Sequence, residues 1–111
     1  MIQFITDNEL KTEIAEKILY NLPEWFGLPD STKEYIQKSK EMPFWAYYCD
    51  DKPVGFIVLK ETSKSTAEIY VMGILKEYHR RGIGKALWNV FEAYAKTVGY
   101  EFAQVKTVQK G

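Results

Sequence analysis

A short segment rich in positive charge and glycine is the part of this sequence best suited to bind an anion. It reads His79-Arg80-Arg81-Gly82-Ile83-Gly84-Lys85. Arg80, Arg81 and Lys85 supply positive charge, and arginine forms paired hydrogen bonds with phosphate oxygens. Gly82 and Gly84 lack a Cβ, so their backbone can approach a bound anion closely. The residue types and their spacing therefore predict a turn that holds a diphosphate.

The elements on either side of this basic turn support that prediction. The residues before it, Ile69–Ile74, are mostly β-branched or aromatic, which is typical of a strand. After it, apolar residues recur every three or four positions on one helical face: Ile83, Leu87, Val90, Phe91, Tyr94 and Val98. Gly99 ends this helix. Because the unpaired N–H groups at the start of a helix attract anions, the order strand, turn, helix suits an anion site.

Two common phosphate-binding motifs do not match this turn. A P-loop requires serine or threonine after its lysine, but Ala86 follows Lys85. The dinucleotide fingerprint requires a third glycine where this chain has Leu87. A nucleotide-phosphate-binding domain therefore has only the basic turn in its favour.

The turn instead resembles the acetyl-CoA signature of the GNAT superfamily of N-acetyltransferases, which is written [QR]-x-x-G-x-[GA] and follows a strand. Here the signature corresponds to His79–Gly84, with a histidine where glutamine or arginine is usual. The resemblance implies transfer of an acetyl group from acetyl-CoA to a primary amine by direct attack. It implies acetyl-CoA as co-substrate and no metal.

The resemblance also implies cofactor contacts for individual residues. The turn His79–Lys85 would hold the diphosphate, with the side chain of His79 limited to a ligand contact. The strand before the turn would pair through its backbone with the pantetheine arm. Met72 matches the position of the family's carbonyl-polarising amide, and Gly73 beside it allows a bulge or a close ligand approach. Met72, Gly73 and Ile74 therefore join the expected cofactor-binding residues.

Glu68 is the expected catalytic base. It lies at the same distance before the glycine turn as the catalytic glutamate of the histone-acetyltransferase branch of the family. Strand alternation predicts that Glu68, Tyr70, Met72 and Ile74 share one face, so the carboxylate and the Met72 amide would border one site. Two alternatives stay open. Glu68 is a solvated carboxylate near a turn, or Tyr70 is the base, although a phenol with a pKa of about 10 is a poor base at neutral pH.

The acceptor site is expected near Trp25 and Phe26. These aromatic residues lie in the loop Pro23–Pro29 between two expected helices, a segment that often borders the acceptor in the GNAT family. The resemblance implies that they and Tyr70 contact the acceptor, which would be a small-molecule amine or a peptide amine. The alternative is that both aromatic residues pack over the helix ends.

Composition narrows the functional classes. The chain has 111 residues, of which 46% are hydrophobic, so residues 1–111 suit one domain with a buried core. Lys+Arg and Asp+Glu both number 15, which gives no case for nucleic acid or an anionic membrane as partner. No apolar run approaches a membrane span, and the first ten residues do not have the pattern expected of a signal peptide. One cysteine excludes a disulfide framework and a cysteine zinc site, and the default location is cytoplasmic.

Periodicity and turn residues predict the order β-α-α-β-β-β-α-β. The expected strands are 2–5, 44–49, 54–59, 66–74 and 102–108, with turns at 50–53 and 61–65. The first helix is expected to begin with a capping box of Thr6 and Glu9 and to reach about Asn21. The second would be capped by Asp30 or Ser31 and reach about Lys40. A crossover through the third helix makes the last two strands parallel, which is an α/β fold with a mixed sheet and the GNAT order.

The C-terminal end of the sequence affects which partners and how much activity we expect. GNAT domains normally continue with another helix and two strands, so the resemblance implies a domain truncated at its C-terminus. The strand Phe102–Val108 would then be an open edge that favours a homo-oligomer or another partner chain. An alternative function follows: a weak or inactive truncated domain that binds CoA or a partner chain.

Overall fold

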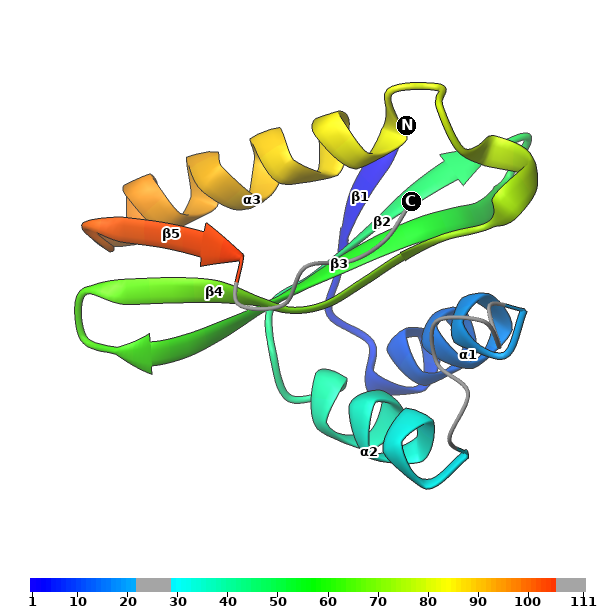
Figure 1. Ribbon diagram of the computed structural model, residues 1–111, viewed down its shortest axis with the longest axis horizontal. Helices are drawn as coiled ribbons and strands as arrows, with labels where there is room; N and C mark the ends of the chain where they lie inside the picture. The colour runs from blue at the N-terminus through cyan, green and yellow to red at the C-terminus, as the bar shows by residue number, and fades with distance from the viewer. Residues whose placement is uncertain (22–28, 106–111) are drawn as a thin grey trace.

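The computed structural model describes residues 1–21 and 29–105 and contains the predicted order of elements (Figure 1). Its strands are β1 (Ile2–Ile5), β2 (Phe44–Cys49), β3 (Lys52–Ser63), β4 (Thr66–Ile74) and β5 (Phe102–Val105). Its helices are α1 (Asn8–Leu19), α2 (Pro29–Ser39) and α3 (Ile83–Val98), and η1 (Lys76–Tyr78) is a short 3₁₀ turn. The order confirms the α/β class.

The strands form one mixed sheet in the order β1-β2-β3-β4-β5. β1 to β4 are successively antiparallel, whereas β5 runs parallel to β4. The crossover through α3 is therefore confirmed. β5 lies at one edge of the described sheet, and association through that edge stays a prediction.

Helices cover both faces of this sheet. α1 and α2 lie on one face and α3 lies across the other (Figure 1). On the α1/α2 side, the rings of Phe44 and Phe56 stack with centroids 5.1 Å apart. On the α3 side, Trp45 meets Phe91 of α3 edge-on at 6.5 Å. Cover on both faces explains why β2 and the first half of β3 are apolar at nearly every position.

The cap of α1 lies one residue later than the predicted capping box. Asp7, not Thr6, is the N-cap, and its Oδ1 accepts hydrogen bonds from the N–H groups of Glu9 at 2.9 Å and Leu10 at 3.3 Å. Aspartate is a strong N-cap because its carboxylate satisfies these N–H groups and also favours the positive end of the helix dipole. α1 ends at Leu19, short of the predicted Asn21.

α2 begins at Pro29, so Asp30 and Ser31 lie inside the helix and not before it as predicted. Proline is favoured at the first helical position because its missing N–H would have no helical partner there and its φ already suits a helix. α2 ends at Ser39, within one residue of the prediction.

A buried lysine joins α1 to the end of α2. Lys11 is only 7% exposed, and its Nζ donates hydrogen bonds to the carbonyl oxygens of Met42 at 2.9 Å and Lys40 at 3.2 Å. Burial lowers the pKa of Lys11. The two carbonyl groups stabilise the charged ammonium, since carbonyl oxygens beyond the C-terminus of a helix carry partial negative charge.

The hairpin between β2 and β3 is tighter than predicted. Asp50 and Asp51 form a two-residue turn with φ values of 52° and 64°, as in a type I′ hairpin. β3 starts at Lys52, so Pro53 belongs to the strand and not to the turn. β3 also continues beyond the predicted Leu59, because its polar second half pairs with the start of β4.

Candidate active site

Two left-handed residues shape the turn between β4 and α3. Arg80 has a φ of 65° and Gly82 a φ of 79°. Gly82 is the N-cap of α3, and its carbonyl accepts the first intrahelical bond, from the N–H of Ala86 at 3.0 Å. Within the described residues, no side chain caps this helix. The next N–H groups therefore lack a partner in the helix; they belong to Ile83, Gly84 and Lys85.

The two glycines of the turn have different structural roles. A Cβ on Gly82 would meet no atom within 4 Å, so the space beside this residue is open, and its positive φ disfavours other residues. A Cβ on Gly84 would lie 3.4 Å from Cδ1 of Ile74, an ordinary contact. Gly82 is thus required by its backbone conformation, whereas alanine fits at position 84.

Positive charge surrounds this opening. Arg80, Arg81 and Lys85 are exposed. The Arg81 guanidinium lies 5.1 Å from the ring centre of Tyr78, a cation–π contact that restrains it beside the turn. Free N–H groups, open space and nearby cations are the features that a bound diphosphate requires, so the residues present fit such a group.

His79 contacts the backbone of β4. Its Nε2 lies 2.7 Å from the carbonyl oxygen of Ile74. A contact of this side chain with the ligand stays a prediction. The structure places the imidazole against the last residue of the strand.

Among residues 1–21 and 29–105, the outer edge of β4 beside the turn has no strand partner. The N–H of Leu75 donates to the carbonyl of Val54 in β3 at 2.9 Å, and N–H groups alternate in direction along a strand. The N–H groups of Met72 and Ile74 therefore point away from β3. In the described residues, pairing between β4 and β5 extends only to Ile69. The outer edge of β4 thus continues past that pair toward the turn.

A β-bulge in β4 changes which side chains lie on each face of the sheet from those predicted by strand alternation. Val58 of β3 is opposite Val71, but the next residue of β3 is opposite Ile69, so Tyr70 is the extra residue. Glu68 lies opposite Lys60, and Tyr70 contacts α2, so Glu68 and Tyr70 share the α1/α2 face.

Met72 and Ile74 have the opposite orientation. A Cβ on Gly73 would meet Ile18 and Leu19 of α1, so its neighbours Met72 and Ile74 face α3. The prediction that all these side chains share one face with Glu68 is wrong, because the bulge shifts the alternation by one residue.

Glu68 is a buried carboxylate. It is 6% exposed, so the alternative of a solvated strand-end carboxylate is wrong. Tyr70, on the same face, packs edge-on against Tyr35 of α2 with centroids 5.3 Å apart, and the Lys60 ammonium lies 5.6 Å from its ring centre. Burial raises the pKa of Tyr70, so even less of its phenolate, the form that accepts a proton, is present at neutral pH.

Sequence reasoning did not include Tyr35 and Lys60 in this region. Tyr35 comes from α2 and Lys60 from β3, and both reach Tyr70 only through tertiary packing and strand pairing. No local pattern distinguishes either residue. Trp25 and Phe26, predicted to line the acceptor site, lie outside the described residues.

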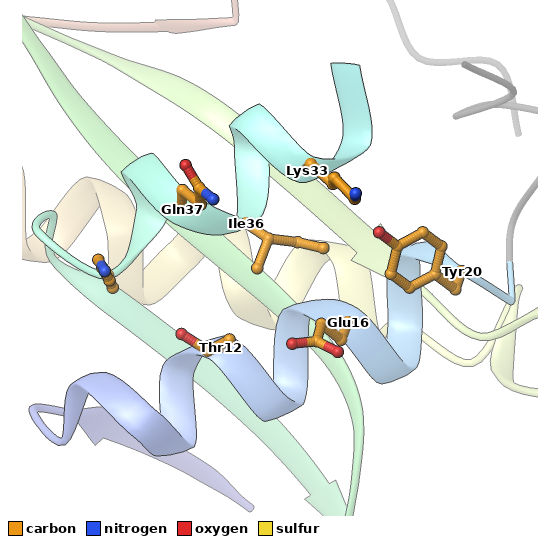
Figure 2. Close-up of a pocket in the computed structure, with 7 residues that line it drawn as sticks. Thr12, Glu16, Tyr20, Lys33, Ile36 and Gln37 are labelled. Carbon is orange, nitrogen blue, oxygen red and sulfur yellow. The ribbon is translucent and has the colours of Figure 1, made fainter. Parts of the chain in front are cut away.

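A groove with a volume of about 400 Å³ lies between α1 and α2 (Figure 2). Its lining is Thr12, Glu16, Tyr20, Lys33, Ile36, Gln37 and Lys40, none of which was predicted for the site.

Among residues 1–21 and 29–105, no group of three or more histidine, cysteine, aspartate or glutamate residues is placed to hold a metal. No helix there is both long and apolar enough to cross a membrane.

The sequence matches a known protein family. Residues 12–110 match the Acetyltransferase (GNAT) family. No curated protein sequence gives a significant match.

Solved structures share this fold. A possible acetyltransferase from Clostridium difficile 630 is 20% identical, with a TM-score of 0.75 over 100% of this chain and 81% of the other. Ribosomal-protein-alanine N-acetyltransferase from Brucella melitensis biovar Abortus 2308 is 14% identical, with a TM-score of 0.74 over 98% and 80%. Aminoglycoside N-acetyltransferase AAC(6′)-Iy, solved with CoA, is 14% identical, with a TM-score of 0.73 over 97% and 76%. At these identities the likeness establishes the fold.

Proposed function

This chain belongs to the Acetyltransferase (GNAT) family, and from that membership we propose that it transfers an acetyl group from acetyl-CoA to a primary amine by direct attack. One observation carries the proposal: the free N–H groups at the start of α3 lie beside the end of β4, whose outer edge is unpaired in the described residues after Ile69. These two backbone surfaces suit one elongated ligand with an anionic end.

The turn would bind the anionic end. The N–H groups of Ile83, Gly84 and Lys85 would donate to a diphosphate, with the open space at Gly82 admitting it. Arg80 and Arg81 would add charge-assisted contacts. The positive φ values of Arg80 and Gly82 define the backbone of the turn without a ligand, so its N–H groups would need little ordering on binding.

The open edge of β4 would bind the arm. Backbone groups of Gly73 and Ile74 would border it in the manner of an added strand. The N–H of Met72 would donate to the acetyl carbonyl, where negative charge develops during acyl transfer. Acetyl-CoA supplies an acetyl group activated as a thioester.

Glu68 would accept the proton of the attacking amine, directly or through a water molecule. Its place on the α1/α2 face, which it shares with Tyr70, supports this role. Tyr70 is less suited to the role because burial raises its pKa. We assign Tyr70 to the wall of the acceptor site.

The acceptor is proposed to be a small-molecule or peptide amine. The names of two proteins with this fold refer to a ribosomal-protein alanine and to aminoglycosides, so the fold serves both acceptor classes. Trp25 and Phe26 are proposed to line this site with Tyr70.

The test is release of CoA thiol from acetyl-CoA over a panel of aminoglycosides, polyamines and peptides with free N-termini. We expect amine-dependent thiol release together with acetyl-CoA binding by calorimetry. Binding without release for any amine would instead support the alternative, a CoA-binding domain without turnover. ATP binding in place of CoA binding would contradict both functions.

A further inference from the structure

We propose that His79 is a positioning residue that fastens the anion-binding turn to the end of β4. This inference rests on the proposed CoA-binding function, and it concerns how the chain itself holds two binding surfaces together. The turn carries the free N–H groups, and β4 carries the open edge. The contact between His79 Nε2 and the Ile74 oxygen, at 2.7 Å, joins the two.

The contact with Ile74 shows which nitrogen of the His79 ring carries a proton. A carbonyl oxygen only accepts hydrogen bonds, so Nε2 of His79 must carry the proton. Nε2–H is present both in one neutral tautomer and in the imidazolium. The bond to Ile74 can therefore form with a neutral or a positively charged imidazole.

The backbone of the turn shows why such a fastening is needed. Arg80 directly follows His79 and has a φ of 65°, a left-handed conformation that is unfavourable for arginine. A residue stays in such a conformation only where surrounding contacts impose it. The His79–Ile74 bond on one side of Arg80 and the Arg81–Tyr78 contact on the other supply these contacts.

The position of the Ile74 carbonyl explains why its bond to His79 would affect ligand binding. Within a strand the N–H and C=O of one residue point to the same side, so the Ile74 oxygen lies on the outer edge of β4. This is the edge that continues back to the Met72 N–H. Fastening the turn there sets the spacing between the diphosphate site and the strand edge, which a ligand that spans both must match.

Two isosteric substitutions test the proposal. The amide nitrogen of glutamine occupies the position of Nε2, whereas that of asparagine occupies the position of Nδ1. His79→Gln should therefore keep the donor and the wild-type affinity for CoA. His79→Asn should weaken CoA binding roughly three- to ten-fold, because the turn would have to be ordered on binding, while thermal unfolding shows that the variant still folds. Equal CoA affinity of the wild type and both variants would overturn the proposal.

The ratio of the two affinities across pH distinguishes positioning from direct contact with the anion. The ratio of the His79→Asn Kd to the wild-type Kd should stay constant between about pH 5.5 and 8.5, because Nε2–H is present in both the neutral and the charged imidazole. A ratio that rises at low pH would show that the imidazolium contacts the phosphate, and would overturn the positioning role.

A measurement without ligand separates this proposal from the proposed function. His79 is the one histidine of the chain, so a ¹⁵N spectrum of its ring is unambiguous. We expect the Nε2–H tautomer at neutral pH and faster amide exchange across residues 79–85 in His79→Asn than in His79→Gln. The Nδ1–H tautomer, or equal exchange, would overturn the proposal even if CoA does not bind. Absence of CoA binding by the wild type, with these results as expected, would contradict the proposed function alone.

Discussion

At the scale of single residues, the position of Glu68 matters most for the proposed chemistry. Its carboxylate lies on the α1/α2 face with Tyr70, while Met72 presents its N–H at the strand edge. The bulge at Tyr70 thus places the side chains of Glu68 and Met72 on opposite faces of β4. In the proposed function, Glu68 would accept the proton of the amine on the α1/α2 side, and the Met72 N–H would donate to the thioester carbonyl at the strand edge.

Replacement of Glu68 tests the role of the base. Glu68→Gln keeps the size of the side chain and removes its ability to accept a proton, so kcat should fall by roughly 10²–10⁴-fold. The affinity for acetyl-CoA, measured by calorimetry, should stay nearly constant. Glu13→Gln, at an exposed carboxylate of α1, is the control and should keep wild-type turnover. Wild-type turnover and pH profile in Glu68→Gln would show that this carboxylate is not the base.

At the scale of elements, α3 has a left-handed glycine at each end. Gly82 precedes the helix with a φ of 79°, and Gly99 follows it with a φ of 110°. A Cβ at either position would meet no atom within 4 Å. The two ends are therefore alike in conformation, but only Gly82 lies in the proposed binding site.

This similarity provides a matched pair of variants. Gly82→Ala and Gly99→Ala should each lose about 1–2 kcal/mol of unfolding free energy, because alanine is strained at positive φ. Only Gly82→Ala should also weaken CoA binding, by roughly tenfold or more, equivalent to about 1.4 kcal/mol. Urea unfolding and calorimetry measure the two effects. Equal CoA affinities in folded Gly82→Ala and Gly99→Ala would contradict a binding role for the turn.

The connection between α1 and α2 depends on Lys11. Lys11→Met keeps the aliphatic chain but removes both hydrogen bonds to the carbonyls of Lys40 and Met42. We expect a loss of about 1–3 kcal/mol in unfolding free energy, since buried carbonyl groups lose a partner. Lys17→Met, on the exposed side of α1, should change the stability by about 0.5 kcal/mol or less. Similar urea midpoints for the two variants would show that the Lys11 bonds contribute no net stability.

At the scale of the whole molecule, glycine allows the helices to approach the sheet closely. A Cβ on Gly73 of β4 would lie 3.1 Å from Cγ2 of Ile18 in α1 and 3.2 Å from Cε1 of Phe56 in β3. On the other face, a Cβ on Gly55 of β3 would lie 3.3 Å from Cγ2 of Ile83 in α3. These close approaches help to place both helix layers against the strands that carry the site.

Gly73→Ala tests this close packing. The added methyl group would force α1 or Phe56 to move, so we expect a loss of about 1–3 kcal/mol in unfolding free energy. Gly84→Ala is a control of opposite sign, because its Cβ makes an ordinary contact and alanine stabilises a helix by about 0.5–1 kcal/mol relative to glycine. If Gly73→Ala were as stable as the wild type, the contact between α1 and the sheet would accommodate the methyl group without loss of unfolding free energy.

The sequence by itself determined the order of the elements and the position of the basic turn. Strand Thr66–Ile74, the helix ending at Gly99 and the glycine turn between them follow from residues that are neighbours in the chain. The spacing of hydrophobic residues and the positions of glycines that allow a turn involve only a few neighbouring residues. These features can therefore be predicted from the local sequence. The ends of helices and strands were predicted less accurately, as the cap at Asp7 shows, because nearby polar residues compete for the same N–H groups.

Only the tertiary structure decided which groups meet at the site. The bulge at Tyr70 depends on how β3 pairs with β4, and it places Glu68 on the face opposite to Met72. The contact of Tyr35 with Tyr70 depends on where α2 packs on the sheet. Strand alternation alone gave the wrong face because one extra residue reverses it for every position beyond. Such an insertion is set by contacts with another strand, which no pattern within β4 records.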